Sequence, residues 1–360
     1  MECTLTSIME NRSDLVSWAF GNQSYDQDRV IYIDAEQPER TITAKQARQK
    51  VKQLVAGLKA AGLRKGDCVC IHAFNDIEYP ILVLAIIGAG GIFTGTNPAY
   101  TPTELSRHLR ETRARFVVSD SDLLHKISVA TSDCGLPVSN VFVLNSQEQV
   151  CDPYRPYEVL LASGESDWVT FSEPDEAKRT TAALLSTSGT SGFPKAAMIS
   201  HHNLITQTMQ LDDVKHKPYS VSRLVALPIF HAFALPLAHT LPLREGTPTC
   251  IMKRLDLPRF LQNIHQYRIT ETAIVPAIVT SILKNSVKAY MLLRSLRTIW
   301  CAGSPLAQVT QDRMFRLLRP TARLLQVWGM TEAGWITTFL WPEKDHSGSV
   351  GRLLPGMEAK

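Results

Sequence analysis

Short apolar runs rich in β-branched residues alternate with segments of helical periodicity along most of this chain. In the first half, buried-strand patterns occupy residues 68–74, 115–120 and 140–145. Residues 43–62 place apolar side chains at helical spacing, with Thr43 as the expected N-cap and Gly62 as the expected C-cap. Strand–helix alternation of this kind favours an α/β fold with largely parallel sheets.

The alternation lapses between residues 146 and 180, a polar, acidic and proline-containing stretch that we interpret as a connector. Strand patterns then return at 182–186, 223–228, 247–252, 270–276, 296–303 and 322–329. Helical segments between them include 256–268 and 306–319. The chain has 360 residues, enough for two or three domains or sub-domains. We predict two doubly wound sub-domains in α/β/α/β/α layering, residues 1–180 with the connector and residues 181–340.

Composition narrows the classes of function. A formal net charge of +4 is too small to indicate a nucleic-acid partner. The strongest apolar run, residues 81–93, is too short for a transmembrane segment and favours a buried helix. The seven cysteines are scattered without a CxxC pair, and the N-terminus has no secretory pattern. We therefore expect reduced thiols, a cytoplasmic location, no transmembrane segment and no nucleic-acid partner.

The stretch 186–195, "STSGTSGFPK", concentrates hydroxyl side chains and two glycines before Pro194 and Lys195. Backbone N–H groups and hydroxyls at such a bend form a concave set of donors suited to phosphate oxygens, and Lys195 adds a cation. The spacing does not match GxxxxGK[ST], which disfavours an ordinary P-loop kinase or GTPase. The alternative interpretation is a Ser/Thr-rich surface turn.

Four later segments accompany this loop. They read "LPIFHAFAL" (227–235), "CAGSPL" (301–306), "QVWGMTEAG" (326–334) and "GSVGRLLPGMEAK" (348–360). Together with the loop, and in this order, they resemble the motifs of the adenylate-forming superfamily. The chain is most similar to 4-coumarate–CoA ligase-like and fungal acyl-CoA ligases, and the resemblance covers nearly its whole length.

The resemblance implies a two-step reaction. A carboxylic acid is activated by ATP to an acyl-adenylate with release of pyrophosphate, and a thiol then displaces AMP. It also implies Mg²⁺, coenzyme A as the thiol, a small-molecule carboxylic acid as the other substrate, and a role in secondary metabolism. In the first step negative charge gathers on phosphate oxygens, so catalysis needs preorganised positive charge and positioning.

The resemblance also assigns residues to the nucleotide. Those implied to grip the β- and γ-phosphates are Ser186, Thr187, Ser188, Gly189, Thr190, Ser191, Gly192 and Lys195. Those implied to surround the AMP moiety are Gly303, Ser304, Pro305, Gln326, Val327, Trp328, Gly329, Met330 and Thr331. Trp328 would stack on the adenine, and a core tryptophan is the alternative interpretation.

Catalytic roles are implied for Lys195, His231, Thr331 and Glu332. Glu332 matches the carboxylate that binds magnesium, a cation that prefers oxygen ligands, and Thr331 the hydroxyl near the α-phosphate. The alternative for this Thr-Glu pair is a helix N-terminus. His231 would line the acid pocket, whereas a satisfied core histidine is its alternative.

The implied acid pocket is apolar. Its members besides His231 are Phe233, Leu237 and Val327. Because an apolar pocket separates similar apolar groups only weakly, an aryl acid and a medium-chain aliphatic acid both remain open. The arginines at 294–323 could attract the phosphates of coenzyme A, although a solvated helix face is favoured.

The resemblance extends to the start of a third, barrel-like sub-domain at residues 341–360. The family's ribose-binding aspartate, hinge and small C-terminal domain with its lysine lie beyond the motifs in this sequence. We therefore expect this chain to correspond to most of the family's large N-terminal domain, and to bind ATP but form adenylates poorly by itself. The alternative is a catalytically impaired remnant that binds a nucleotide or an acid.

Overall fold

The computed structural model describes residues 14–21, 23–144, 152–173, 175–187, 195–212 and 217–358. These residues form two compact units. The first unit takes its described residues from Met1–Asn22, Lys45–Phe74 and Glu78–Thr206, and the second from Gln23–Ala44, Asn75–Ile77 and Gln207–Lys360. Each unit contains a seven-stranded sheet that is parallel except for one outer strand, which confirms the predicted α/β class with two largely parallel sheets.

The sheet of the first unit has the strand order β7-β6-β5-β3-β4-β8-β9. Its strands are β3 (Cys68–His72), β4 (Ile92–Gly95), β5 (Ala114–Asp120), β6 (Val141–Leu144), β7 (Arg155–Pro156), β8 (Thr181–Ser186) and β9 (Ala196–Ser200). β9 alone runs antiparallel, against β8. All five residues of β3 are buried, because a central strand is covered on both faces.

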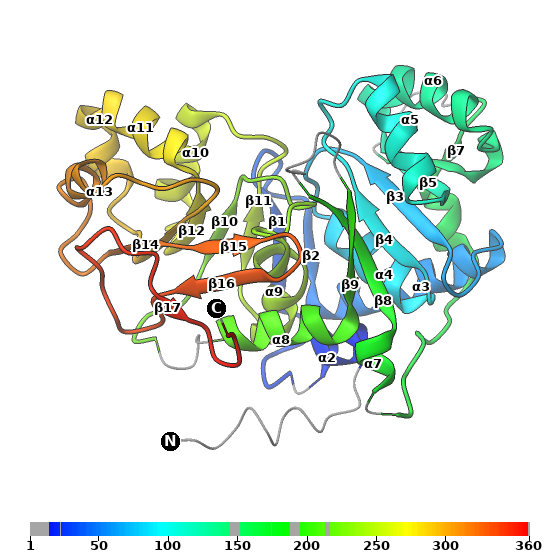
Figure 1. Cartoon of the computed structure of the whole chain (residues 1–360), viewed down its shortest axis with the longest axis horizontal. Helices are drawn as coiled ribbons and strands as arrows, with labels where there is room; N and C mark the ends of the chain where they lie inside the picture. Colours follow the sequence, from blue (N-terminus) through cyan, green and yellow to red (C-terminus); the bar gives the residue numbers. More distant parts are fainter. Residues whose placement is uncertain are drawn as a thin grey trace. The chain divides into compact units, whose positions relative to one another are not determined.

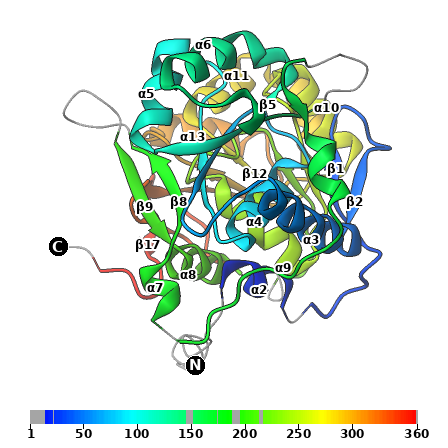
Figure 2. The ribbon, with the colours of Figure 1, turned by 90° about the vertical axis from the view of Figure 1, so that its right-hand side faces the viewer.

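Helices cover both faces of this sheet (Figures 1 and 2). They are α2 (Leu15–Phe20), α3 (Ala44–Ala60), α4 (Tyr79–Gly88), α5 (Pro102–Glu111), α6 (Leu124–Cys134), α7 (Glu176–Arg179) and the start of α8 (His201–Leu211), with the 3₁₀ turns η1 (Ser121–Leu123), η2 (Val138–Asn140) and η3 (Tyr157–Ala162). Leu105 of α5 and Ile127 of α6 pack with Cys70 and Val117 of the sheet. Every residue of α4 is buried, which confirms a buried helix in the apolar run at 81–93.

The sheet of the second unit has the order β14-β13-β12-β10-β11-β1-β2. Its strands are β1 (Val30–Asp34), β2 (Thr41–Thr43), β10 (Arg223–Val225), β11 (Thr249–Ile251), β12 (Glu271–Ile274), β13 (Thr298–Cys301) and β14 (Arg323–Gln326). The helices are η5 (Pro236–Thr240), a π-helix, with α9 (Leu241–Glu245), α10 (Leu257–Gln266), α11 (Pro276–Lys284), α12 (Ser286–Leu292) and α13 (Gln308–Phe315). Figure 1 shows α10 to α13 grouped on one side of β12 to β14.

A small antiparallel sheet completes the second unit. It consists of β15 (Trp328–Met330), β16 (Gly334–Thr338) and β17 (Arg352–Leu353), in that order. The predicted barrel-like part began only at residue 341, whereas this sheet already begins at Trp328. Among the residues that the structure describes, these three strands form an open sheet and no closed barrel.

The boundary between the units differs from the predicted one at 180/181. β8 and β9 belong to the first sheet, where β8 pairs with β4, and β1 and β2 belong to the second, where β1 pairs with β11. Local periodicity identifies a strand but not its partner, because sheet pairing joins residues far apart in sequence. After the loop, residues 196–200 form a strand, and helix α8 begins at His201.

The predicted connector is packed into the first unit over its described part. The Tyr157 hydroxyl donates to Glu78 Oε2 at 3.0 Å, and the Trp168 ring stacks on Phe20 with centroids 5.6 Å apart. This stretch forms only the short elements β7, η3 and α7, and its aromatic side chains help to anchor it. Within the described part of the chain, no helix combines the length and apolar character needed to cross a membrane.

Candidate functional site

Four neighbouring strands of the second unit, β10, β12, β13 and β14, run parallel, so their carboxyl ends meet at one edge of the sheet. Three of them lead directly into predicted site residues. These are His231 and Phe233 after β10, Gly303–Pro305 after β13, and Val327–Glu332 after β14. In open α/β sheets, ligands bind outside this edge. The second unit therefore brings the predicted adenine, magnesium and acid residues to one side of a single sheet.

The Gly303–Pro305 turn is supported from behind by Gln326. Gly303 has a φ of +93°, a backbone conformation that favours glycine, and the turn is exposed. The buried Gln326 side chain accepts from Leu306 N at 2.8 Å and donates to Leu306 O at 3.1 Å and to Gly348 O at 2.7 Å. Gln326 was predicted to bind nucleotide, and its amide instead bonds the backbone beside the turn.

β15 presents an exposed aromatic side chain. Trp328 is 48% exposed and Met330 is 51% exposed, so the alternative of a core tryptophan does not hold. A Cβ on Gly329 would lie 2.1 Å from Gly334 O, which leaves glycine as the residue that lets the two strands approach. Glu332 is exposed in the turn after β15, and Thr331 is half-buried.

His231 lies at the surface rather than in the core, contrary to the alternative interpretation. The backbone N–H of Phe233 donates to His231 Nδ1 at 3.2 Å. Surrounding protein atoms lower the pKa of His231 below its ordinary value, so the ring is neutral at pH 7. A neutral imidazole that accepts at Nδ1 carries its proton on Nε2, which leaves an N–H donor for a ligand.

The other predicted pocket residues are less accessible. Leu237 and Val327 are buried in the hydrophobic core. Phe233 is partly buried at the edge of that core, with its ring 5.0 Å from the ring of Trp335. Trp335 Nε1 also donates to Phe233 O at 2.9 Å. Sequence reasoning missed Trp335, although it lies just beyond the motif at 326–334.

In the first unit, the described ends of the predicted phosphate loop form the base of a hairpin. The backbone N–H of Thr187 donates to Lys195 O at 2.8 Å, and Ser186 pairs with Ala196 across β8 and β9. The Lys195 side chain is exposed. Lying outside the described residues are Ser188, Gly189, Thr190, Ser191 and Gly192.

A buried histidine orients the first hydroxyl of this loop. Thr94 Oγ1 donates to Leu184 O at 2.6 Å, so it accepts from His108 Nε2 at 2.9 Å. Burial lowers the pKa of His108 to about 4, so the ring is neutral and Nδ1 is an acceptor. Ser186 Oγ, 3.3 Å away, therefore donates to His108 Nδ1. Sequence reasoning missed His108, since a lone histidine in an amphipathic helix is uninformative.

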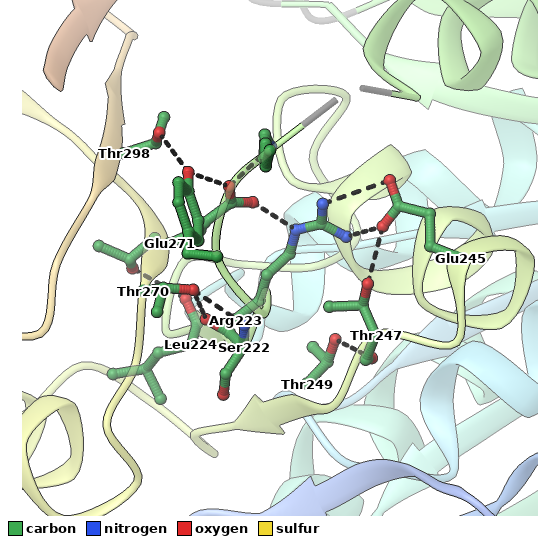
Figure 3. Close-up of polar contacts among 12 residues, drawn as sticks. Ser222, Arg223, Leu224, Glu245, Thr247, Thr249, Thr270, Glu271 and Thr298 are labelled. Atoms are coloured by element: carbon green, nitrogen blue, oxygen red, sulfur yellow. Dashed lines mark hydrogen bonds and ion pairs between the residues drawn. The ribbon is translucent and has the colours of Figure 1, made fainter. Parts of the chain in front are cut away.

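The opposite, amino edge of the second sheet holds buried charges (Figure 3). Arg223 begins β10 and Glu271 begins β12, and Arg223 Nε lies 3.2 Å from Glu271 Oε2. Lys217 Nζ contacts Glu271 Oε1 at 2.6 Å, and Arg223 also pairs with Glu245. Two cations and two carboxylates balance here, so we interpret this cluster as structural.

The described residues contain no group of three or more His, Cys, Asp or Glu side chains arranged to hold a metal ion. Magnesium that accompanies phosphates needs only one or two protein carboxylates, because phosphate oxygens and water complete its shell. The single exposed carboxylate of Glu332 fits that mode of binding and does not fit a metal cage built from protein alone.

Comparison with known proteins identifies the family of this chain. The family model described as AMP-binding enzyme matches residues 20–360, so the chain belongs to that family. The "Phenylacetyl-CoA ligase epaB" of Aspergillus niger is 44% identical over 353 residues, which cover 96% of this chain and 66% of that protein. The "Nicotinic acid-CoA ligase pyr1" of Aspergillus fumigatus is 34% identical, covering 97% and 64%. This chain thus spans just under two thirds of these relatives' length.

Solved structures show the same fold. ATP-bound MatB from Rhodopseudomonas palustris is 25% identical, with a TM-score of 0.79 over 95% of this chain and 65% of that chain. The anthranilate CoA ligase AuaEII in complex with anthranoyl-AMP has a TM-score of 0.83 at 20% identity, covering 95% and 65%. At that identity the likeness shows the fold alone.

Proposed function

We propose that this chain carries the acid-activating part of an acid–thiol ligase that uses coenzyme A. A carboxylate oxygen of the acid attacks the α-phosphorus of ATP, and pyrophosphate leaves. The coenzyme A sulfur then attacks the acyl carbon, AMP leaves, and an acyl-CoA forms. The observation that carries the proposal is the convergence of Gly303–Pro305, Trp328–Glu332 and His231 on one carboxyl edge, in a chain of the AMP-binding family.

The exposed indole of Trp328 would stack on the adenine, with the Gly303–Pro305 turn on the other side of the ring. Glu332 would hold the Mg²⁺ that accompanies the phosphates, and a bound Mg²⁺ neutralises phosphate charge. Lys195 would grip the outer phosphates with Ser186, Thr187, Ser188, Gly189, Thr190, Ser191 and Gly192. The Thr331 hydroxyl would lie near the α-phosphate.

His231 would donate from Nε2 to a carboxylate oxygen of the acid and so orient the oxygen that attacks. This role is supported by the bond from Phe233 N to His231 Nδ1, which leaves the proton on Nε2. Phe233, Leu237 and Val327 would make the acid pocket apolar. The names of the relatives, a phenylacetyl-CoA and a nicotinic acid-CoA ligase, favour an aryl acid over an aliphatic one.

We further propose a cytoplasmic enzyme of secondary metabolism. Support comes from the likeness to fungal acyl-CoA ligases. The acid identity is best approached with a panel that contains phenylacetate, nicotinate, 4-coumarate and octanoate.

The test has two measurements on residues 1–360. ATP binding is measured by calorimetry, and acyl-adenylate formation is measured as pyrophosphate release and as hydroxamate trapped by hydroxylamine. Glu332→Gln should abolish Mg²⁺-dependent ATP binding, whereas Glu358→Gln, an exposed carboxylate on the same unit, should retain it. Absence of ATP binding by the wild type would overturn the proposal. ATP binding without adenylate from any acid would favour the impaired remnant.

A further inference from the structure

The peptide groups of Ile229 are held on both sides, two residues before His231. The backbone N–H of Ile229 donates to Asn75 Oδ1 at 3.1 Å, and its carbonyl accepts from His239 Nε2 at 2.8 Å. Both side chains are buried, as is Ile229 itself. Buried hydrogen bonds of this kind cost more to lose than exposed ones, because the abandoned partner cannot turn to water. The segment that leads to His231 is therefore fixed at a defined point.

Both the nitrogen and the oxygen of the Asn75 side-chain amide form hydrogen bonds. Its Nδ2 donates to Leu227 O and to Met252 O, both at 3.0 Å, so it joins the segments that follow β10 and β11. The orientation of the amide is unambiguous, because a flipped amide would face two carbonyl oxygens with its own oxygen. Asn75 thus bonds the backbone at Leu227 and Ile229, on the approach to His231.

His239 reaches the same peptide from the other direction. It lies in η5, the π-helix at Pro236–Thr240, and helical turns of this wide kind are frequent at functional sites. Since its Nε2 faces a carbonyl oxygen, that nitrogen carries the proton. Burial lowers the pKa of His239 to about 4, so the ring is neutral at pH 7. Trp335 holds the intervening segment at Phe233 O.

Asn75 lies in a short segment of chain that belongs to the second unit. Residues 75–77 belong to the second unit, although the residues on either side of them belong to the first. Asp76, next to Asn75, forms two bonds of 2.7 Å with the Arg40 guanidinium of the same unit. The three-residue segment 75–77 thus supplies the second unit with two side chains. Asn75 reaches the His231 segment, and Asp76 anchors the segment to Arg40.

We propose that Asn75 and His239 are positioning residues that hold the backbone of residues 227–233 so that His231 presents its Nε2–H to the acid. The inference rests on the proposed function. It assigns neither side chain to the substrate: both act through the backbone of Ile229. Misplacement of a reacting group by about 1 Å can cost about 100-fold in rate, so loss of either contact should affect acid activation strongly.

Three variants and a matched control separate positioning from general stability. Asn75→Asp keeps the acceptor for Ile229 N but sets a carboxylate oxygen against two carbonyls. His239→Leu removes the donor at similar volume, and His239→Gln offers an amide donor in place of Nε2–H. Thr272→Val is the control. Thr272 lies in β12, and its hydroxyl donates a buried 2.8 Å bond to Leu224 O of β10, the strand that precedes the His231 segment.

The first readout needs no substrate. Hydrogen exchange of the peptide 226–234 should accelerate in Asn75→Asp and His239→Leu, recover in His239→Gln and stay at the wild-type rate in Thr272→Val. The second readout is kinetic. For the two damaging variants we expect kcat/KM for the acid to fall about 100-fold while KM for ATP stays within about twofold, and His239→Gln to recover most of the loss.

The outcomes are distinct. Unchanged exchange at Ile229 in both damaging variants overturns the positioning role even if the enzyme activates an acid. Equal losses for acid and ATP, or a Thr272→Val variant that loses acid activation as much as His239→Leu, also overturn it, since they indicate stability alone. A wild type that activates no acid overturns the proposed function, and this inference with it, whatever the exchange result.

Discussion

The side chain of Gln326 bonds both backbone groups of Leu306, accepting from its N–H at 2.8 Å and donating to its carbonyl at 3.1 Å. Leu306 follows the exposed Gly303–Pro305 turn, and Gln326 ends β14 directly before Trp328. One buried amide therefore ties together the two segments that are proposed to enclose the adenine.

Replacing Gln326 should consequently weaken nucleotide binding, although its side chain bonds the protein backbone and is not proposed to contact the nucleotide. Gln326→Met loses all three bonds, and we expect the protein to be destabilised by about 1–3 kcal/mol. The affinity for ATP should also fall, because the turn is no longer held. Calorimetry and urea denaturation measure the two effects. Gln308→Met is the control, since Gln308 makes one exposed bond, to His346 O at 3.0 Å. ATP affinity equal to that of the wild type would contradict the role of Gln326.

Lys195 offers a test of the phosphate loop. Its side chain is exposed, so Lys195→Ala should leave the thermal midpoint unchanged. We expect the affinity for ATP to fall about tenfold or more, and the affinity for AMP, which lacks the β- and γ-phosphates, to be retained. Lys178→Ala, another exposed lysine of the first unit, serves as the control. Equal losses for ATP and AMP would place Lys195 elsewhere on the nucleotide.

In the buried charge cluster, replacing Glu271 and replacing Glu245 should lower the stability of the protein by different amounts at pH 7. Burial alone would raise the pKa of Glu271, but Arg223 and Lys217 outweigh it and hold that pKa below the ordinary value. Glu271→Gln leaves two cations with one carboxylate, and we expect a loss of about 3–5 kcal/mol.

Glu245 should behave differently. Burial raises the pKa of Glu245 to about 7, so its contribution to stability declines as the pH rises from about 4.5 toward 7. Glu245→Gln should therefore cost less than Glu271→Gln at pH 7, and it should cost more at pH 5.5 than at pH 7, because protonated Glu245 contributes more to the stability of the wild type there. Chemical denaturation at both pH values measures this. A Glu245→Gln variant as unstable as Glu271→Gln would contradict the difference between the two carboxyls.

His201 predicts acid sensitivity in the first unit. Its Nδ1 accepts from Leu15 N at 3.1 Å, and burial lowers its pKa to about 4. The unfolded chain binds a proton near pH 6.5, so the stability from neutral His201 is complete above that pH. It is lost as the pH falls toward 4, by about 3 kcal/mol in total. His201→Asn keeps an acceptor but cannot titrate. Its stability should vary less between pH 7 and 4.5 than that of the wild type or of His265→Asn, an exposed control.

Local pattern predicted much of the fold. The apolar run at 81–93 contains most of α4 and ends in β4, and the strand patterns at 68–74 and 115–120 became β3 and β5. β1 and β2 were not predicted, and their place in the second sheet depends on pairing with β11, more than 200 residues later. Pairing over such a distance is decided by tertiary packing, which periodicity does not record.

The same distinction applies to the site. Motifs predicted Gly303–Pro305 and Trp328 as site residues, and both follow parallel strands, β13 and β14, at one edge of the sheet. Their supports were invisible: Asn75 lies 152 residues before Leu227, and His108 lies 78 residues before Ser186. Each is an ordinary polar residue in its local sequence, and only the contact across the fold reveals what it holds.

The insertion at residues 75–77 also affects how this protein could be divided. The second unit is made of three separate segments of the sequence, so a fragment that begins at residue 207 would lack β1, β2 and Asn75. Exchanging that unit between related enzymes would therefore require three pieces to be transplanted together. Swapping only the carboxyl-terminal half would place a new His231 segment, proposed to bind the acid, beside an Asn75 from the other enzyme.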